Sequence, residues 1–318
     1  MPKQSSYSRD ALVEVAKMHY LQKLSQEEIA QKIHVSRPTV SRMLKSAYDQ
    51  GIVQIRIDDV SSAGVELART ICDNFNVKYA IVVPSGATSE QSKINVGAAA
   101  AMYLENNIFD KNLVGISWGT TLYSTVTQMK AFDDIEADVI QLIGGIGSKT
   151  IDTDGNTISL TLAQKINGDN YVLQAPLIVQ SKLLKDLLTS EPHIREHFNK
   201  MLDCDIALVG LGSVDPKLSA QLRSGYITMP ETDRLKSEGA VGDICGTHYN
   251  IDGEICPSSF SDRTIAISLS ALSKIPKVVG LVAGEEKIRC TYGALKGGYL
   301  DMVIMDEALA KKVINHQI

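Results

Sequence analysis

Residues 113–121 read LVGISWGTT, an apolar run that passes through a glycine into two threonines. The apolar part, 113–117, is typical of a buried β-strand, and the threonines are typical of the start of a helix. A strand that leads directly into a helix is the building unit of parallel α/β sheets. This stretch therefore predicts the fold class of the larger part of the chain.

The same unit recurs along the rest of the sequence. Short runs rich in valine, isoleucine and leucine predict further strands at 79–83, 139–143, 171–174, 206–211, 278–283 and 302–305. Predicted helical stretches separate most of these strands. The alternation predicts a Rossmann-like α/β fold, with a mostly parallel sheet and helices on both faces. Because ligands bind such sheets at the carboxyl ends of the strands, binding residues are expected just after each strand.

The loop after 113–117 has the residues of a phosphate site. Gly119 allows close approach of the backbone, while Thr120 and Thr121 add hydroxyl groups to the free amides at the positive end of a helix. We expect these three residues to bind an anion. The alternative is an ordinary turn, because glycine and threonine are common between strands and helices.

The glycine-rich end of the strand at 139–143 is a second candidate site. Gly144 and Gly145 permit close approach of a ligand to the backbone. The stretch is not a nucleotide-binding loop, because the Walker pattern requires glycine at positions 143 and 148, which are isoleucine and serine here. The stretch at 210–212 likewise lacks the third glycine of a dinucleotide fingerprint.

Two later segments contribute charged candidates. Asp243 can accept hydrogen bonds from sugar hydroxyls, or it can simply cap a turn. Glu285 and Lys287 follow the strand at 278–283, where the glutamate can hold hydroxyls and the lysine can neutralise a phosphate. The alternative for this pair is an ordinary acidic first turn of a helix.

Residues 24–57, LSQEEIAQKIHVSRPTVSRMLKSAYDQGIVQIRI, predict a second and smaller domain. Ser25 and Glu28 have the spacing of a capping box, so a helix begins there. Ser36 can cap the next helix, and His34 stands in the turn between them, at a position that favours a left-handed backbone. Two helices joined in this way form a helix-turn-helix, whose second helix lies in the major groove of DNA.

The second of these helices has a buried face and an exposed face. Val40, Leu44 and Ala47 occupy core positions. The exposed residues are of the types that contact base edges and phosphates, with almost no acids among them. The predicted DNA contacts are Ser36, Arg37, Thr39, Ser41, Arg42 and Lys45.

A strand at 52–57 is expected to complete a winged variant of the motif, with Arg56 available to a phosphate. A further helix is expected at 9–21. The alternative for this region is therefore a small domain of three packed helices that does not bind DNA. The expected organisation is a winged helix-turn-helix domain at 1–58, a polar linker at 59–64, and an effector-binding and oligomerisation domain at 65–318.

Charge is distributed unevenly along the chain. Residues 1–57 contain nine Lys/Arg against five Asp/Glu, whereas the remainder contains 23 against 32. If this clustering is not due to chance, a basic head on an acidic body concentrates the attraction to phosphates in the head.

Composition excludes several classes of protein. The apolar share of 44% and charged share of 22% are those of a folded chain, with no apolar run long enough to cross a membrane and no apolar leader, so a cytoplasmic protein is expected. The five cysteines are scattered without a CxxC pair, which predicts neither a disulfide framework nor a zinc site. No metal or other cofactor is expected, and His193, His197 and His248 are expected to be structural.

The head at 24–57 is followed, in order, by VGISWGTT, QLIGGIGS, LVGLGSV, SGYI, AVGDICGTHYNIDGEI, GLVAGEEK and GALKGGYLDMVIMDE. No single stretch decides a family, but their number and order resemble the SorC/DeoR family of bacterial sugar-responsive transcription regulators over nearly the whole chain. Within that family, the deoxyribonucleoside-regulator subgroup is the most similar, followed by the sorbitol-type regulators.

The resemblance implies a sensor domain similar to the glucosamine-phosphate deaminase and ribose-phosphate isomerase fold. It also implies a phosphorylated sugar or polyol as effector and a homo-oligomer, either a dimer or a tetramer. By the family's pattern, phosphate is held by Gly119, Thr120, Thr121 and Lys287, and the sugar by Gly144, Gly145 and Asp243.

One position bears on the identity of the effector. An aldehyde sugar such as deoxyribose 5-phosphate, held as an imine, requires a lysine in the pocket, whereas the strand end here has Ile143, with Lys149 the nearest lysine. We therefore expect either non-covalent binding of that sugar or, by preference, a polyol or ketose phosphate as the effector.

The sequence thus predicts a DNA-binding regulator of a carbohydrate-metabolism operon rather than an enzyme, with operator DNA and the effector as partners. The alternative is a sugar-phosphate isomerase or deaminase with a DNA-binding head, in which Asp243 or Glu285 acts as the base. That alternative lacks an acid–base pair with a histidine nearby. A DNA-architectural protein without a ligand leaves the glycine-rich strand ends unexplained.

Overall fold

The computed structural model describes residues 7–22, 24–49, 52–53, 62–132, 134–145, 154–257 and 260–316. The chain forms two compact units, Met1–Asp58 and Asp59–Ile318. Among the described residues, no helix combines the length and the apolar character needed to cross a membrane.

The described part of the first unit, called the head below, contains three helices. They are α1 (Arg9–Ala16), which continues into a π-helical turn (Lys17–Leu21), α2 (Gln26–Lys32) and α3 (Arg37–Asp49). The predicted capping box is present, because the Glu28 amide donates to Ser25 Oγ at 3.2 Å and the Ser25 amide donates to Glu28 Oε2 at 2.8 Å. His34 has a φ of 54°, which confirms the left-handed turn between α2 and α3.

The head has a hydrophobic core of its own. Its buried members are Leu12, Val15, Ala16, Ile29, Ala30, Val40, Met43, Leu44 and Ala47. Ile52 and Val53 pack against this core as bends rather than as a strand, and their amides donate to the Ala47 carbonyl at 2.9 and 3.2 Å. The rest of the predicted wing strand, including Arg56, lies outside the described residues.

The second unit, called the sensor domain below, is built on a seven-stranded parallel sheet with the order β1-β10-β9-β5-β2-β3-β4. Each strand overlaps one of the predicted runs, which confirms the Rossmann-like α/β fold. The strands are β1 (Tyr79–Val83), β2 (Leu113–Ile116), β3 (Asp138–Gln141), β4 (Asn170–Tyr171), β5 (Ile206–Gly210), β9 (Val278–Leu281) and β10 (Met302–Asp306).

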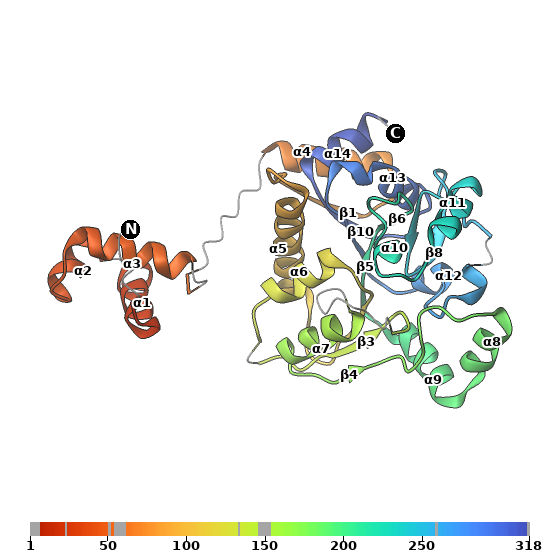
Figure 1. The fold of residues 1–318 in the computed structure, drawn as a ribbon, viewed down its shortest axis with the longest axis horizontal. Coiled ribbons are helices and arrows are strands. Elements are labelled where there is room, and N and C mark those ends of the chain that lie inside the picture. Colours follow the sequence, from red (N-terminus) through yellow and green to blue (C-terminus); the bar gives the residue numbers. More distant parts are fainter. Residues whose placement is uncertain are drawn as a thin grey trace. The chain divides into compact units, whose positions relative to one another are not determined.

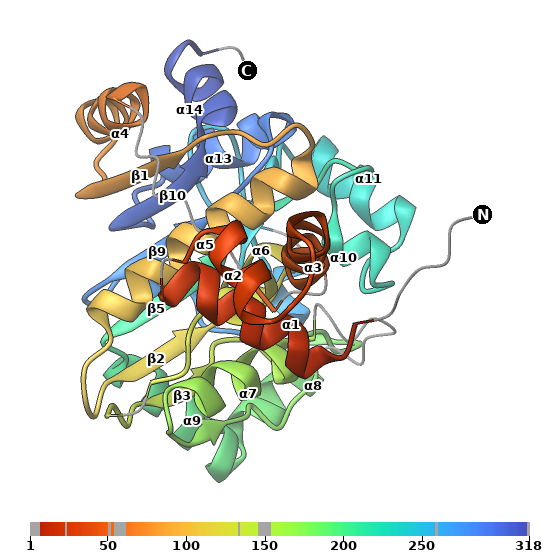
Figure 2. The same cartoon turned by 90° about the vertical axis from the view of Figure 1, so that its left-hand side faces the viewer.

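Helices cover both faces of this sheet. One face carries α5 (Ser89–Asn107), α6 (Thr120–Gln128) and α7 (Gly155–Lys165), which lie in front of the strands in Figure 2. The other face carries α4 (Ser62–Asn74), α9 (Pro192–Lys200), α13 (Ile288–Lys296) and α14 (Glu307–Ile314), with α14 beside α4 (Figure 1). The predicted linker at 59–64 is helical from Ser62 onward, and residues 59–61 lie outside the described residues.

Alternating residues of each central strand pack into two separate hydrophobic cores, one on each face of the sheet. On β2, Val114 and Ile116 pack in the core that contains Leu122 of α6, whereas Leu113 packs in the core that contains Leu309 of α14. This alternation follows from the pleat, since successive side chains point to opposite faces of a sheet. The central strands are therefore fixed from both sides, and so are the loops at their carboxyl ends.

A small antiparallel sheet, which the sequence did not predict, extends from the end of β5. It consists of β6 (Gly212–Ser213), β7 (Gly242–Ile244) and β8 (Thr247–Tyr249). A tight turn joins β7 to β8 through Cys245 and Gly246, whose φ angles of 51° and 76° are those of a two-residue hairpin loop.

The described part of the sensor domain also contains shorter elements. They are α8 (Lys182–Ser190), α10 (Ala220–Arg223), α11 (Met229–Ser237), α12 (Leu269–Leu272) and the 3₁₀ turns Met201–Asp203, Ser261–Arg263 and Glu285–Lys287.

Candidate functional site

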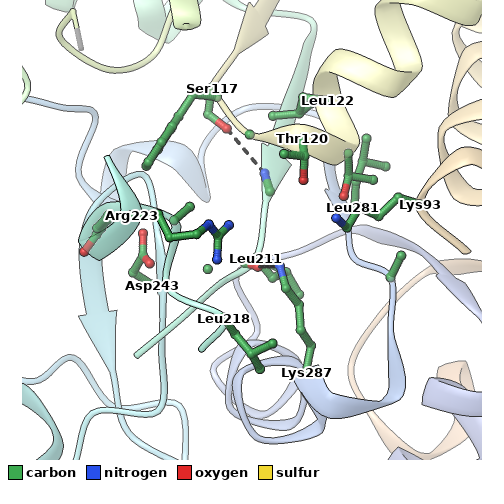
Figure 3. A pocket seen from close by; sticks show the side chains of 18 of the residues that line it. Lys93, Ser117, Thr120, Leu122, Leu211, Leu218, Arg223, Asp243, Leu281 and Lys287 are labelled. Atoms are coloured by element: carbon green, nitrogen blue, oxygen red, sulfur yellow. Dashed lines mark hydrogen bonds between the residues drawn. The ribbon is translucent and has the colours of Figure 1, made fainter. Parts of the chain in front are cut away.

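The sensor domain has a cavity of about 360 Å³ at the carboxyl ends of β2, β5 and β9. Its walls come from the loops that follow these strands, from α5, from the segment around α10 and from β7 (Figure 3). The volume falls within the range of roughly 300–1,000 Å³ that is usual for small-molecule sites. The cavity therefore occupies the place where a parallel sheet of this type binds its ligand.

The first turn of α6 forms one wall of the cavity. Gly119 precedes the helix with a φ of 128°, a conformation that side chains rarely adopt, and no side chain caps the helix. Thr120 and Thr121, the first two residues of the helix, line the cavity beside Gly119. The uncapped amides at the positive end of the helix are thus open to a ligand, with the groups of an anion site around them.

Lys287 enters the cavity from the 3₁₀ turn that follows β9. Its Nζ donates to the Leu211 carbonyl at 2.9 Å. Burial lowers the pKa of Lys287, while neighbouring Cys290 and Asp243 act in the opposite direction. A partly desolvated ammonium held by a single backbone acceptor has further donors available for an anionic ligand.

A buried carboxylate fixes the turn that carries Lys287. Asp306, at the end of β10, accepts hydrogen bonds from the Gly284 amide through Oδ2 and from the Ser85 hydroxyl through Oδ1, both at 2.7 Å. Gly284 has a φ of 99°, which favours glycine at that position. The position of Lys287 thus depends on β10 as well as on β9.

Asp243 of β7 forms the opposite wall. Its carboxylate is buried, and Oδ2 accepts a hydrogen bond from the Gly246 amide at 3.1 Å. Burial raises the pKa of Asp243, while the nearby His248 lowers it. Gly212, its partner on β6, makes room for the side chain, since a Cβ at this position would overlap Oδ1 and lie 2.8 Å from Cγ.

His248 lies opposite Asp243 on β8 and is fully buried. Neither ring nitrogen has a hydrogen-bond partner among the described residues, and the ring packs edge-on against Phe260 with centroids 5.1 Å apart. Burial lowers the pKa of His248. The imidazole is therefore held in an environment that favours its neutral form.

The structure brings five of the predicted effector-binding residues to this cavity and leaves three outside it. Its lining includes Gly119, Thr120, Thr121, Asp243 and Lys287 but not Gly144, Gly145 or Glu285. Glu285 is exposed and forms an ion pair with Lys312 at 3.1 Å, whereas Glu286, the next residue, reaches the cavity and accepts a hydrogen bond from Ser89 at 2.9 Å.

The two glycines after β3 contact protein backbone instead of the cavity. A Cβ at Gly144 would lie 2.7 Å from the Pro176 carbonyl, and the Gly145 amide donates to the Ala175 carbonyl at 2.7 Å. The prediction was that a ligand approaches the backbone here, whereas the structure shows the chain's own backbone in that place. Lys149 lies outside the described residues.

Other lining residues have no sequence signal that singles them out. Lys93 comes from α5, and Lys217, Gln221 and Arg223 come from the segment around α10. Lys93 pairs with Glu90 at 2.7 Å. These residues do not come directly after a predicted strand, so the rule that places ligands at strand ends does not find them. Only the folded chain shows their position.

The predicted DNA-contact residues lie on the accessible side of α3. Ser36, Arg37, Ser41, Arg42 and Lys45 are exposed and Thr39 is half-buried. Within this set, the Ser36 and Thr39 hydroxyls are hydrogen-bonded at 2.9 Å, and Arg42 Nε donates to the Pro38 carbonyl at 3.3 Å. Arg37 forms an exposed ion pair with Glu27 of α2 at 2.9 Å.

Comparison with known proteins places this arrangement in a family. Residues 61–315 match the family described as "Putative sugar-binding domain". The deoxyribonucleoside regulator of Bacillus subtilis is 31% identical over 95% of this chain and 96% of its own length, and the sorbitol operon regulator of Klebsiella pneumoniae is 26% identical over 95% and 97%.

A solved structure extends the similarity to the fold of nearly the whole chain. The full-length sorbitol operon regulator SorC from Klebsiella pneumoniae superposes with a TM-score of 0.81 at 26% identity, covering 98% of this chain and 100% of that one. The order of motifs, the parallel sheet and these matches agree. The chain belongs to the SorC/DeoR family of transcriptional regulators that carry a sugar-binding domain.

Proposed function

We propose that this chain is a DNA-binding transcription regulator of carbohydrate metabolism, and that a phosphorylated sugar or polyol in the cavity controls its affinity for operator DNA. The observation that carries the proposal is the first turn of α6, where uncapped amides follow Gly119 and share the cavity with Lys287. Free amides at a helix N-terminus together with an ammonium are the groups that bind a phosphate dianion.

Asp243 supplies the complementary group for the rest of the ligand. Its buried carboxylate reaches the same cavity and already accepts one hydrogen bond from the Gly246 amide. A carboxylate has lone pairs for further donors, and sugar or polyol hydroxyls are such donors. A phosphate held at α6 and hydroxyls held at Asp243 would together fix the orientation of the ligand.

The head supplies the other partner. The exposed residues of α3 are suited to the major groove, with phosphates providing affinity and base edges providing specificity. The head at 1–58 and the effector domain at 65–318 would act within a cytoplasmic homo-oligomer, a dimer or a tetramer, so that several heads bind related half-sites. The similar proteins from Bacillus subtilis and Klebsiella pneumoniae are named as regulators, which supports DNA as a partner of the head.

Control of DNA binding then follows from thermodynamic linkage. If the effector favours one arrangement of sensor domains, it changes the freedom or spacing of the heads and so the operator affinity. A coupling free energy of about 1–3 kcal/mol changes that affinity roughly 5- to 150-fold.

The test is a thermal-shift screen of the purified protein against phosphorylated sugars and polyols, each paired with its unphosphorylated form. A ligand that binds only the folded state raises the melting temperature. We expect a rise with a phosphorylated compound that is lost in Thr120→Ala and in Lys287→Ala, but kept in Thr127→Ala, an exposed threonine at the far end of α6.

Two results would contradict the proposal. If only an unphosphorylated sugar raises the melting temperature, the cavity does not bind a phosphate. The assignment of the head as the DNA-binding unit would still stand. Conversion of a phosphorylated compound into an isomer or a deaminated product would favour the enzyme alternative, in which Asp243 acts as a base.

A further inference from the structure

An ion pair connects α2 and α3 on the surface of the head. Arg37, the first residue of α3, has its Nε 2.9 Å from Oε1 of Glu27 in α2. Both side chains are exposed, to 65% and 60%. A carboxylate beside the predicted DNA contacts opposes the attraction to phosphates, so Glu27 weakens DNA binding unless it contributes in another way.

Helix formation does not account for this contact. Glu28, the next residue, is the acid that completes the capping box with Ser25. Glu27 lies in the same first turn, where a negative charge stabilises the positive end of a helix, but that effect requires no contact with α3. An exposed ion pair also adds little to folding stability. The approach of Glu27 to Arg37 is therefore a feature separate from the stability of α2.

The fold of the head fixes the distance between the two residues. His34, with its left-handed φ of 54°, turns the chain between α2 and α3, and the Val35 amide donates to the Ala30 carbonyl at 3.0 Å. The two helices share a hydrophobic core that contains Ile29 and Val40. The ion pair thus joins two positions of a packed backbone, so Glu27 restrains the direction of the Arg37 side chain.

The ion pair engages the Nε side of the Arg37 guanidinium. Its other N–H donors are on Nη1 and Nη2 at the tip of the side chain. These two groups form the fork that matches O6 and N7 of a guanine in the major groove. Arg37 is also at the N-terminal end of the recognition helix, the part that contacts base edges in a helix-turn-helix.

Arg42, further along the same helix, is held in a different way. Its Nε donates to the Pro38 carbonyl of its own helix at 3.3 Å. A carbonyl does not balance a full positive charge, so Arg42 keeps its attraction for phosphates, whereas Glu27 offsets the charge of Arg37. The two arginines are therefore suited to different parts of the DNA.

We propose that Arg37 binds the edge of a guanine in the operator, and that Glu27 is the positioning residue that orients the Arg37 guanidinium. The inference rests on the proposed function and specifies how its head recognises sequence. A long side chain that is restrained before binding loses less entropy when it meets the base, and this gain acts only where the base presents matching acceptors.

The test selects binding sites for the full chain from a randomised library of duplex DNA. The enriched sequences give the base preference at each position of a half-site. We expect a guanine at one position whose preference Arg37→Ala reduces by about 5- to 150-fold, the discrimination of one bidentate contact. Preferences at the other positions should remain, which also shows that the head of the variant is folded.

Glu27→Gln is the decisive variant, because it keeps the size of the side chain and removes its charge. It should lower the guanine preference at the same position by roughly 2- to 12-fold, the gain from ordering one side chain in advance. Glu27→Asp should restore part of that preference. On a duplex that lacks the selected site, Glu27→Gln should bind at least as tightly as the unaltered chain, because it removes an acid near the phosphates.

Glu14→Gln is the matched control. Glu14 forms an exposed ion pair with Lys17 on α1 at 3.9 Å, so this variant removes the same charge from the same domain. It should keep the full guanine preference. Equal changes in Glu14→Gln and Glu27→Gln would show that the net charge of the head, rather than the contact with Arg37, causes the effect.

Three other outcomes reject the inference and leave the proposed function standing. If Arg37→Ala weakens binding to every sequence alike and reduces the slope of log affinity against log salt by about one, Arg37 contacts a phosphate. If Glu27→Gln keeps the guanine preference, Glu27 does not position Arg37. If the base that depends on Arg37 is not guanine, the fork does not bind as proposed. Enrichment of no sequence by the unaltered chain would instead contradict the DNA binding of the proposed function itself.

Discussion

Replacing Gly212 by alanine should displace the Asp243 carboxylate while leaving the aspartate itself intact. The new Cβ would overlap Oδ1 and lie 2.8 Å from Cγ, so the side chain of Asp243 has to turn away. Gly212 does not have a positive φ, and the substitution therefore acts through this contact rather than through backbone strain. The hydrogen bond from the Gly246 amide to Oδ2, 3.1 Å long, is lost with the movement.

The size of the effect follows from the groups involved. A buried amide left without its acceptor costs about 1–3 kcal/mol of folding free energy. For a domain of this size, each kcal/mol lowers the melting temperature by about 2–4 °C, so a fall of roughly 2–12 °C is expected. If Asp243 accepts hydroxyls of the effector, the loss of a charged hydrogen bond, about 1.5–3 kcal/mol, weakens effector binding by roughly 10- to 150-fold.

The assay is a double-mutant cycle with Asp243→Ala, scored by melting temperature and by titration of a phosphorylated compound that binds the unaltered protein. Once the carboxylate is absent, alanine at position 212 has little left to displace, so the two substitutions should be strongly non-additive. Equal losses of affinity from Gly212→Ala in both backgrounds would refute the reasoning, because the effect would then not pass through Asp243.

Three further perturbations test other parts of the structure. Asp306→Ala leaves the Gly284 amide without its acceptor and removes the Ser85 contact, so chemical denaturation should show a loss of about 2–6 kcal/mol, and less for Asp306→Asn, which keeps one acceptor oxygen. Burial lowers the pKa of His248 below its ordinary value of 6.5, so the folded chain binds fewer protons than the unfolded chain and stability should fall as the pH drops through 6.5. The raised pKa of Asp243 has the opposite effect on stability, which rises as the pH drops. His248→Leu should therefore reduce the fall in melting temperature between pH 7 and pH 5. An unchanged dependence of melting temperature on pH would exclude His248 as the source of the fall. Arg42→Ala should weaken operator binding and, if Arg42 contacts a phosphate, reduce the slope of log affinity against log salt by about one, with effector binding unchanged and Lys32→Ala of α2 as the control.

The parts of the fold that sequence predicts well are those set by local chemistry. The capping box of Ser25 and Glu28 needs only residues three apart, and the left-handed turn at His34 needs only its neighbours. The central strands of the parallel sheet, such as β2, β5 and β9, can be predicted because strands covered on both faces are continuous apolar runs.

The parts that sequence misses depend on contacts between distant segments. β6, β7 and β8 have only two or three residues each, too few for any periodicity, although their pairing positions Asp243. The sequence pattern singles out Glu285, whereas Glu286 lines the cavity, because the pattern does not show how a 3₁₀ turn orients two adjacent acids. Gln221 and Arg223 reach the cavity from a four-residue helix whose sequence has no motif at all.

The anchoring of the Lys287 turn by the last strand of the sheet has a consequence for the order in which the protein becomes functional. The core of the head lies within residues 7–53, so a nascent chain can complete it early in synthesis. The turn that carries Lys287 is secured only when Asp306 of β10 has been made, near the other end of the chain. A ribosome-bound or truncated chain would therefore have a folded head before it has a folded sensor domain. Any DNA binding by such a fragment would not respond to the effector.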